Sequence, residues 1–245
     1  MKNLIIDAGN SRVKVFVFEE DKVLESFFLL EQDFEKKIKK ILSENEISRI
    51  ILSSVSGLTE NILILIENSY ELVVLTNDTK VPFINKYESP KTLGVDRIAL
   101  MSAAASEFAN KNVLVIDAGT CITFDFKNSK NEYLGGAISP GIQMRYRALN
   151  EFTEKLPLLG ISEQNTLIGN NTNKSIHSGV LNGVIGEIDG VIDRYKSEFG
   201  DLTVVLTGGD TYFLSKRLKN SIFANPNFLQ EGLNSILIYN NKNDK

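Results

Sequence analysis

Two stretches of the sequence decide its fold: MKNLIIDAGNSRVKVFVFEE at residues 1–20 and VLVIDAGTCITFDF at residues 113–126. In both, an apolar run ends on the tripeptide Asp-Ala-Gly, and a second, partly alternating run follows a short polar turn. Apolar runs of this length on either side of a turn predict a pair of strands. Asp7 thereby aligns with Asp117, and Gly9 with Gly119, which indicates an internal duplication.

The segments around these strand pairs predict an α/β protein built from two similar halves. In the first half we expect strands at residues 4–9, 12–20, 22–30, 49–55 and 70–76, with helices at 34–42, 58–68 and 93–109. In the second half we expect strands at 112–119, 121–126, 133–138 and 203–209, with helices at 140–156, 176–199, 211–219 and 231–239. Two lobes, residues 1–110 and 111–245, with a central ligand cleft at the strand ends follow from this order.

The composition excludes several classes of function. The 245-residue chain has a net charge of −4 and a pI of about 5.3, whereas nucleic-acid binders usually carry a basic surface. A single cysteine, Cys121, rules out an internal disulfide and a cysteine-based zinc site. We interpret the single histidine, His177, as structural. The N-terminus does not resemble a signal peptide and no apolar run could span a bilayer, so we expect a cytoplasmic protein without a nucleic-acid or membrane partner.

The two Asp-Ala-Gly turns predict a phosphate-binding site. A glycine after a strand lets successive backbone N–H groups surround an anion, and side chains at Asn10, Ser11, Thr120 and Thr123 add donors. The carboxylate at each strand end cannot bind phosphate directly, but it can hold Mg²⁺ or another cation that does. For one turn alone, a hairpin with side-chain turn hydrogen bonds is the simpler interpretation. Two such turns at matching positions favour phosphate binding.

A third strand exit, TGG at residues 207–209, is a further candidate contact with the nucleotide. The chain contains neither a P-loop nor a G-x-G-x-x-G pattern. Nucleotide binding would therefore depend on the duplicated turns and on this exit.

The tetrapeptide GVDR at residues 94–97 opens a predicted helix. An acidic residue in a first turn is favoured by the helix dipole, which is the structural interpretation of Asp96. Arg97 gains nothing from the dipole at this end. The alternative is that Asp96 accepts the proton of a substrate hydroxyl while Arg97 holds a substrate carboxylate, and the residues alone do not decide between the two.

Four glycines in the predicted helix at 176–199 fall on one stripe: Gly179, Gly183, Gly186 and Gly190. Each costs about 1 kcal/mol against alanine in a helix interior, so the stripe needs an explanation. Packing against a strand of the same chain is one, and close approach of another helix, within or between subunits, is the other.

Five motifs taken together resemble the type III pantothenate kinases, a family of the acetate kinase/sugar kinase/Hsp70/actin superfamily. The family pattern D-x-G-N-[ST]-x-x-K matches residues 7–14, G-x-D-R matches residues 94–97, and D-x-G-T-x-x-T matches residues 117–123. GGAISPG and NTNKSIHSG resemble two further patterns of the family. Their order and spacing hold over essentially the whole chain, with Ser11 standing where threonine is more usual.

The resemblance implies a duplicated ribonuclease H-like fold and ATP-dependent phosphorylation of pantothenate, the first step of coenzyme A biosynthesis. It implies a homodimer with the substrate site near the interface, Mg²⁺ with ATP, and a monovalent cation, K⁺ or NH₄⁺, near Asp117. The implied proton acceptor is Asp96. The implied ATP contacts are Asp7, Ala8, Gly9, Asn10, Ser11, Arg12, Val13, Lys14 and Thr120, and the implied pantothenate contacts are Tyr87, Gly94, Val95, Asp96, Arg97 and Thr172.

Two other functions stay open on the sequence. Some members of the family were first described as transcriptional accessory factors, although Asp7, Asp96 and Asp117 are all present here. The other is a different small-molecule kinase of the superfamily, for which the chain is short.

Overall fold

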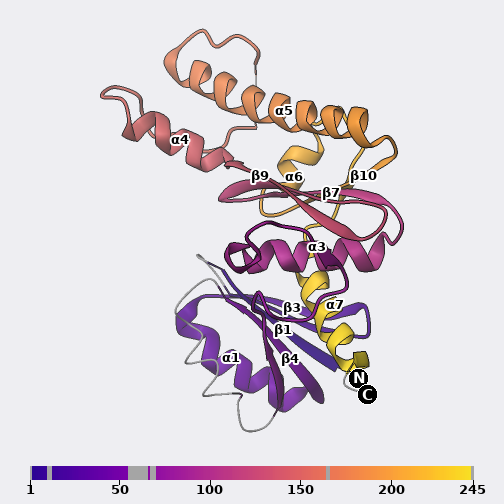
Figure 1. The fold of residues 1–245 in the computed structure, drawn as a ribbon. Coiled ribbons are helices and arrows are strands. Elements are labelled where there is room, and N and C mark those ends of the chain that lie inside the picture. The colour runs from indigo at the N-terminus through magenta and orange to yellow at the C-terminus, as the bar shows by residue number, and fades with distance from the viewer. Residues whose placement is uncertain (1, 10–12, 55–65, 67–69, 164–165, 244–245) are drawn as a thin grey trace. The chain divides into compact units, whose positions relative to one another are not determined.

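The computed structural model describes residues 2–9, 13–54, 66, 70–163 and 166–243 (Figure 1). The chain divides into two compact units. Residues 1–109 and 228–245 form the first unit, and residues 110–227 form the second.

The first unit contains a five-stranded mixed sheet with the strand order β3-β2-β1-β4-β5. β1 pairs antiparallel with β2, which pairs with β3, and β1 runs parallel to β4. The strands are β1 (Lys2–Ala8), β2 (Val13–Glu19), β3 (Lys22–Leu29), β4 (Ile47–Ser54) and β5 (Glu71–Val74). The other elements are helices α1 (Glu31–Glu44), α3 (Val95–Glu107) and α7 (Phe228–Asn243), the short strand β6 (Ile84–Asn85) and a 3₁₀ helix at Pro90–Thr92.

Alternation along β1 gives the two faces of this sheet different partners. Leu4, Ile6 and Ala8 point into a hydrophobic core that also holds the buried side chains of α1. The intervening residues point to the opposite face, where α7 packs against β1 and β4 and also against α3. Asp7, which has the same parity as Asn3 and Ile5, therefore faces α7 rather than α1.

The second unit repeats this topology with the strand order β11-β10-β7-β8-β9. β7 pairs antiparallel with β8 and parallel with β10, as β1 does with β2 and β4. The strands are β7 (Asn112–Ala118), β8 (Cys121–Lys127), β9 (Glu132–Pro140), β10 (Leu202–Thr207) and β11 (Phe223–Ala224), and the helices are α4 (Ile142–Glu151), α5 (Thr172–Phe199) and α6 (Thr211–Ser215). The matching orders confirm the duplicated α/β fold that the sequence predicts.

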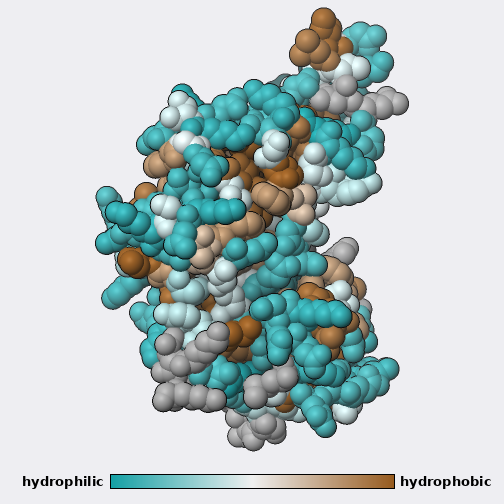
Figure 2. Space-filling view, turned by 90° about the vertical axis from the view of Figure 1, so that its right-hand side faces the viewer, coloured by the Kyte–Doolittle hydropathy of each residue, from teal (hydrophilic) through white to brown (hydrophobic). Residues whose placement is uncertain are grey.

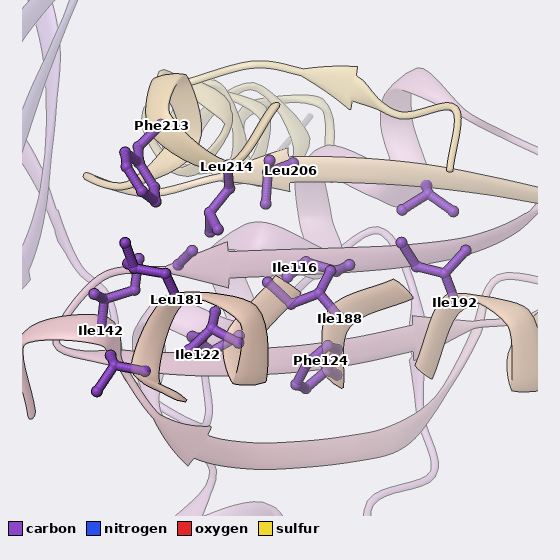
Figure 3. Packing of buried hydrophobic residues seen from close by; sticks show 14 of the residues in the cluster. Ile116, Ile122, Phe124, Ile142, Leu181, Ile188, Ile192, Leu206, Phe213 and Leu214 are labelled. Atoms are coloured by element: carbon purple, nitrogen blue, oxygen red, sulfur yellow. The ribbon is translucent and has the colours of Figure 1, made fainter. Parts of the chain in front are cut away.

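One long helix covers the core of the second unit (Figure 3). Leu181, Ile188 and Ile192 of α5 are fully buried against the apolar side chains of β7, β8 and β10. A helix of 28 residues is about 42 Å long at 1.5 Å per residue, which explains how α5 spans the sheet.

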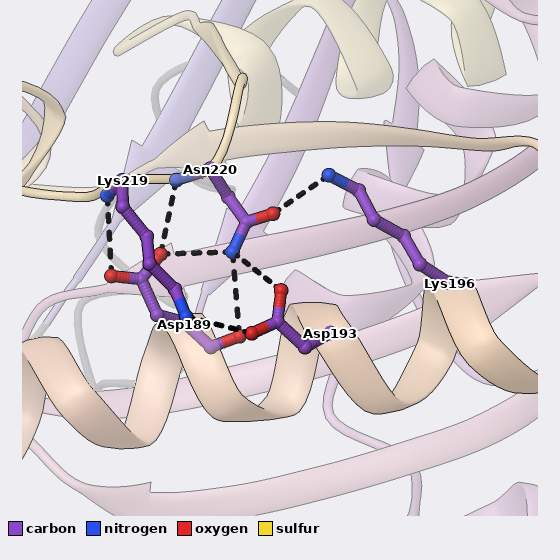
Figure 4. Close-up of polar contacts among 5 residues, drawn as sticks. All are labelled: Asp189, Asp193, Lys196, Lys219 and Asn220. Atoms are coloured by element: carbon purple, nitrogen blue, oxygen red, sulfur yellow. Dashed lines mark hydrogen bonds and ion pairs between the residues drawn. The ribbon is translucent and has the colours of Figure 1, made fainter.

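A polar cluster fastens the middle of α5 to the segment after α6 (Figure 4). The carboxylate of Asp189, 5% exposed, accepts hydrogen bonds from the backbone N–H groups of Lys219 (3.2 Å) and Asn220 (3.1 Å). The side chain of Asn220 also donates to Asp189 at 3.0 Å, and Lys219 pairs with Asp193 at 2.8 Å. Because Asp189 captures these N–H groups, α6 ends at Ser215 and does not extend to residue 219 as predicted.

Other differences from the predicted elements have local causes. α5 begins at Thr172 because Asn171 caps it, accepting a hydrogen bond of 3.0 Å from the N–H of Lys174. α4 ends at Glu151, where the amide of Asn150 turns to the carbonyl of Leu156 at 2.8 Å. β6, β11 and the 3₁₀ helix were not predicted, and the predicted helix at 58–68 lies outside the described residues except for Ile66.

The C-terminal helix belongs to a different unit from the one expected. The sequence predicts lobes of residues 1–110 and 111–245, and the first boundary agrees with the compact units to within a residue. The segment from residue 228 onward joins the first unit, because α7 packs against α3, β4 and β1. The division of the chain into functional lobes stays a prediction.

The molecular surface is mostly polar on the face drawn in Figure 2, where hydrophobic residues form separate small groups. No helix in the described part of the chain is long and apolar enough to cross a membrane.

Candidate active site

The first Asp-Ala-Gly turn places Asp7 at the end of β1. In the register of the sheet, Asp7 lies opposite Lys14 of β2. The side chains of Ala8 and Val13 are buried in the core beneath the sheet, which leaves only their backbone atoms for a nucleotide. Asn10, Ser11 and Arg12, the other predicted contacts of this turn, lie outside the described residues, and Gly9 follows the last residue of β1.

The carboxylate of Asp7 is oriented by a residue from the far end of the chain. Nε2 of Gln230 on α7 donates a hydrogen bond of 2.9 Å to Oδ2 of Asp7. Desolvation raises the pKa of Asp7 above its usual value, while Lys14 and the Gln230 hydrogen bond oppose this rise. The negative charge of Asp96 raises the same pKa further and is the smallest of these effects.

The tetrapeptide at residues 94–97 lies at the N-terminus of α3, the helix that the sequence predicts over residues 93–109. Gly94 is the N-cap and has no side chain that could accept a hydrogen bond from the helix start. The carboxylate of Asp96 does so instead, because its Oδ1 accepts a 2.8 Å hydrogen bond from the N–H of Arg97. A Cβ atom on Gly94 would overlap Oδ1 of Asp96. Val95, between them, is the first helical residue. Glycine at this position therefore lets the Asp96 carboxylate fold back over the helix start.

Arg97 and Tyr87 lie together, as the substrate-binding prediction requires. The guanidinium of Arg97 lies 5.6 Å from the centroid of the Tyr87 ring, within the range of a cation–π contact. Arg97 is only 5% exposed. The loop that carries Tyr87 is held by Asn85, whose Oδ1 accepts a 2.9 Å hydrogen bond from the backbone N–H of Tyr87. The first unit thus brings together Asp7, Asp96, Arg97 and Tyr87.

The second Asp-Ala-Gly turn meets the TGG exit within the second unit. Asp117 lies opposite Thr207 in the parallel pair of β7 and β10, and opposite Thr123 in the antiparallel pair of β7 and β8. Gly208 has a φ of 93°, which favours glycine, and a Cβ there would overlap both Oδ1 of Asp117 and the carbonyl oxygen of Ala118. The close approach that the sequence suggests for this exit is therefore present.

Polar groups surround this second turn. Thr120 is exposed, so its hydroxyl is accessible. The backbone N–H of Asp210 donates to the carbonyl of Ala118 at 2.9 Å, which ties the two strand exits together. Burial raises the pKa of Asp210 above its usual value. Asp210 was not among the predicted site residues, although it directly follows the TGG motif.

Thr172 is the first residue of α5 and is exposed. Beside it is a cavity of about 310 Å³, lined by Ser162, Thr166, Asn171, Asn173, Lys174 and His177. His177 contacts the hydroxyl of Tyr146 through Nδ1 at 2.8 Å, which fits its structural interpretation. Burial raises the pKa of Tyr146 to about 12.

The acidic residues can supply single carboxylates to a cation but not a complete protein cage. No group of three or more His, Cys, Asp or Glu side chains gathers in metal-binding geometry among the described residues. Mg²⁺ is commonly held by one or two carboxylates together with substrate phosphates and water, so a single carboxylate such as Asp7 or Asp117 fits a cation that arrives with a nucleotide.

Gln230 is the functional candidate that sequence reasoning missed. The predicted C-terminal helix begins at residue 231, one residue too late to include it. The segment FLQEGLNSIL places the amides Gln230 and Asn234 at helical spacing, but it also contains Glu231, Gly232 and Ser235, so the sequence does not single the amides out.

Comparisons with known proteins identify the family to which the chain is similar. A family model described as type III pantothenate kinase matches residues 3–194. A type III pantothenate kinase from Flavobacterium johnsoniae is 46% identical over 242 residues, covering 98% of this chain and 99% of that protein. One from Christiangramia forsetii is 48% identical over 239 residues, covering 97% of this chain and 98% of that protein.

Solved structures show the same fold. A protein from Campylobacter jejuni described as a Baf family transcriptional activator superposes with a TM-score of 0.65 at 23% identity, covering 98% of this chain and 99% of that one. A glucokinase from an Antarctic psychrotroph gives a TM-score of 0.53 at 12% identity, with coverages of 97% and 99%. At these identities the likeness concerns the fold alone.

Proposed function

The chain belongs to the type III pantothenate kinase family, and on this premise we propose a role for each residue of the candidate site. The activity is the ATP-dependent phosphorylation of pantothenate, the first step of coenzyme A biosynthesis. The observation that carries the proposed roles is the contact of Arg97 with Tyr87 next to Asp96 at the start of α3, in the unit that also holds Asp7.

Asp96 is the proton acceptor. Its Oδ1 is occupied by the N–H of Arg97, so Oδ2 faces the substrate hydroxyl. As the primary hydroxyl oxygen of pantothenate attacks the γ-phosphorus of ATP and ADP leaves, the hydroxyl proton passes to Asp96. Phosphoryl transfer depends mainly on alignment and charge neutralisation, so the base acts by orienting the hydroxyl as well as by removing its proton.

Arg97, Tyr87 and Thr172 bind pantothenate. The guanidinium of Arg97 is suited to the pantothenate carboxylate, because its N–H donors match a carboxylate in bidentate geometry. Tyr87 contributes its ring face beside Arg97. Gly94 and Val95 contribute backbone at the start of α3, and the exposed Thr172 contributes a hydroxyl.

The two Asp-Ala-Gly turns bind ATP. In the first, Asp7, the backbone of residues 8–13 and Lys14 take part, and Lys14 supplies a positive charge opposite Asp7. In the second, Thr120 and the turn at residues 207–209 offer hydroxyl and backbone N–H donors. Mg²⁺ would bind with ATP on the Asp7 side and a monovalent cation, K⁺ or NH₄⁺, at Asp117, each neutralising phosphate charge.

The active form is a homodimer that forms through α5. The four glycines of α5 are exposed, and a Cβ on any of them would meet no atom within 4 Å in the described structure. Packing against a strand of the same chain therefore does not explain the stripe. Light scattering should give twice the chain mass, and Gly183→Leu should lower it; an unchanged mass and stability would remove this support.

We place the enzyme in the cytoplasm, where ATP and pantothenate are available. Neither nucleic acid nor a membrane has a role in this proposal.

One coupled assay tests the proposal as a whole. ADP formation should require pantothenate, should not be supported by glucose or acetate, and should rise several-fold when K⁺ or NH₄⁺ replaces Na⁺. Activity with a sugar or acetate would indicate another kinase of the superfamily, and absence of ADP formation with every acceptor would indicate a non-catalytic relative acting in transcription.

A further inference from the structure

The face of α7 toward β1 carries two buried amides. Gln230 is 1% exposed and Asn234 is 2% exposed, and both donate or accept hydrogen bonds with side chains of β1. Gln230 donates to Asp7 at 2.9 Å, and Asn234 accepts from Nδ2 of Asn3 at 2.8 Å. Asn234 also donates to the backbone carbonyl of Glu20 at 2.7 Å. A buried amide is stable only when its polar atoms are paired, so these bonds fix the side chains firmly.

α7 also packs against α3, the helix that carries Asp96. A Cβ atom on Gly232 would overlap the carbonyl oxygen of Ala99 in α3, so the two helix backbones are in direct contact there. At the beginning of α7, the ring of Phe228 lies 6.4 Å from that of Phe108, at the end of α3. α7 therefore contacts both the strand that ends in Asp7 and the helix that begins with Asp96.

We propose that Gln230 is a positioning residue for phosphoryl transfer, which fixes the Asp7 carboxylate for the nucleotide while α7 fixes the strand of Asp7 relative to the helix of Asp96. The inference rests on the proposed role of Asp7 in ATP binding. Gln230 itself is buried beneath Asp7 and does not touch the substrate.

The chemistry of an amide suits this role. The N–H group of Gln230 binds one carboxylate oxygen, Oδ2, and leaves Oδ1 of Asp7 available. A neutral donor sets the orientation of the carboxylate and leaves its negative charge in place. A buried lysine or arginine would cancel that charge. Residues that orient a binding group in this way typically change affinity or activity 10–100-fold when they are replaced.

The test compares Gln230→Met with Asn234→Leu. Both replacements remove a buried amide of α7 that bonds to β1, and both put an apolar side chain of similar length in its place. Gln230→Met should lower kcat and the affinity for a non-hydrolysable Mg·ATP analogue, measured by calorimetry, each about 10-fold, with the KM for pantothenate within about 2-fold. Asn234→Leu should lower the unfolding midpoint similarly but keep kcat and nucleotide affinity within about 2-fold.

Two further variants complete the experiment. Gln230→His keeps an N–H donor of similar reach and should retain most of the nucleotide affinity; a loss as large as that of Gln230→Met would contradict the hydrogen-bond role. Gln230→Leu, which removes the donor without adding a group that can hydrogen-bond Asp7, replaces the methionine variant if that protein does not fold.

The variant Asp7→Asn distinguishes a failure of the proposed role of Asp7 from a failure of the proposed role of Gln230. An active Asp7→Asn enzyme would refute the proposed role of Asp7 in the reaction. An inactive Asp7→Asn enzyme beside a Gln230→Met enzyme that behaves like Asn234→Leu would refute the role of Gln230 alone.

Discussion

The carboxylate of Asp96 lies against the backbone of Gly94, so closely that a Cβ atom on Gly94 would overlap Oδ1 of Asp96. The backbone of Gly94 has φ −59° and ψ 135°, values that alanine also adopts. The requirement for glycine is therefore one of space for the Asp96 side chain and not of backbone conformation.

Gly94→Ala should impair catalysis with little loss of stability. The flexible Asp96 side chain can move away from the new methyl group, so the change in unfolding free energy should stay within about 1 kcal/mol. A displacement of about 1 Å should lower kcat by 10-fold or more. Gly160→Ala, at a glycine with open space around it, is the control and should be silent in both assays. Full activity of Gly94→Ala would show that the Asp96 position is not critical.

Asp96→Asn should reduce kcat by 10²-fold or more, because a positioned base contributes about 10²–10⁴-fold. The amide oxygen of asparagine can still accept from the N–H of Arg97, so the helix start should survive. Circular dichroism and the thermal midpoint should match the wild type. Turnover within 3-fold of the wild-type value would exclude Asp96 as the base.

Arg97→Lys should raise the KM for pantothenate about 10-fold and leave the KM for ATP nearly unchanged. Lysine keeps the charge but loses the planar, bidentate donor geometry that fits a carboxylate. Pantothenol, which lacks the carboxylate, is the matched substrate. Its use by wild type and variant should be similar, and an equal loss with both substrates would argue against the carboxylate contact.

Local patterns predicted the fold because both halves use them in the same order. The apolar runs ending at Asp7 and Asp117 are strands that occupy equivalent places in two sheets of matching order. Segments that depend on distant partners were less predictable. α6 ends early because Asp189, some 30 residues away, takes the N–H groups of Lys219 and Asn220.

In the candidate site, too, residues near one another in sequence were predictable and a residue from a distant segment was not. Asp96 and Arg97 are adjacent in one motif, and the structure places Tyr87, which the family resemblance implies as a substrate contact, beside Arg97. Gln230 lies 223 residues from Asp7, and no local pattern connects the two. The contact arises only because α7 returns to the first unit.

Lys127 should make stability depend on pH in the alkaline range. Its side chain is fully buried, with Nζ donating to the carbonyl of Lys111 at 3.0 Å and to Oδ1 of Asn131 at 2.8 Å. Burial lowers the pKa of Lys127 to about 8. Between pH about 8 and the unfolded value of about 10.5, the unfolded chain holds more protons at this site, so its contribution to stability rises with pH.

Urea unfolding of wild type and Lys127→Met at a series of pH values measures this contribution. The unfolding free energy of wild type should increase relative to that of Lys127→Met by up to about 3 kcal/mol between pH 8 and pH 10.5. Below pH 7 the difference should be constant. A difference that does not change across the whole range would mean that Lys127 titrates normally.

Asp189→Ala should destabilise the second unit more than Asp193→Ala, the same change at an exposed residue one turn further along α5. The substitution removes the hydrogen bonds that the backbone N–H groups of Lys219 and Asn220 donate to this carboxylate, each worth about 1.5–3 kcal/mol for a charged acceptor. Asp193→Ala removes an exposed ion pair with Lys219 and should destabilise the protein clearly less, because solvent screens exposed charges. Urea unfolding followed by circular dichroism measures both. Equal effects of the two substitutions would show that the cluster stabilises α5 through its surface charges rather than through the buried acceptor.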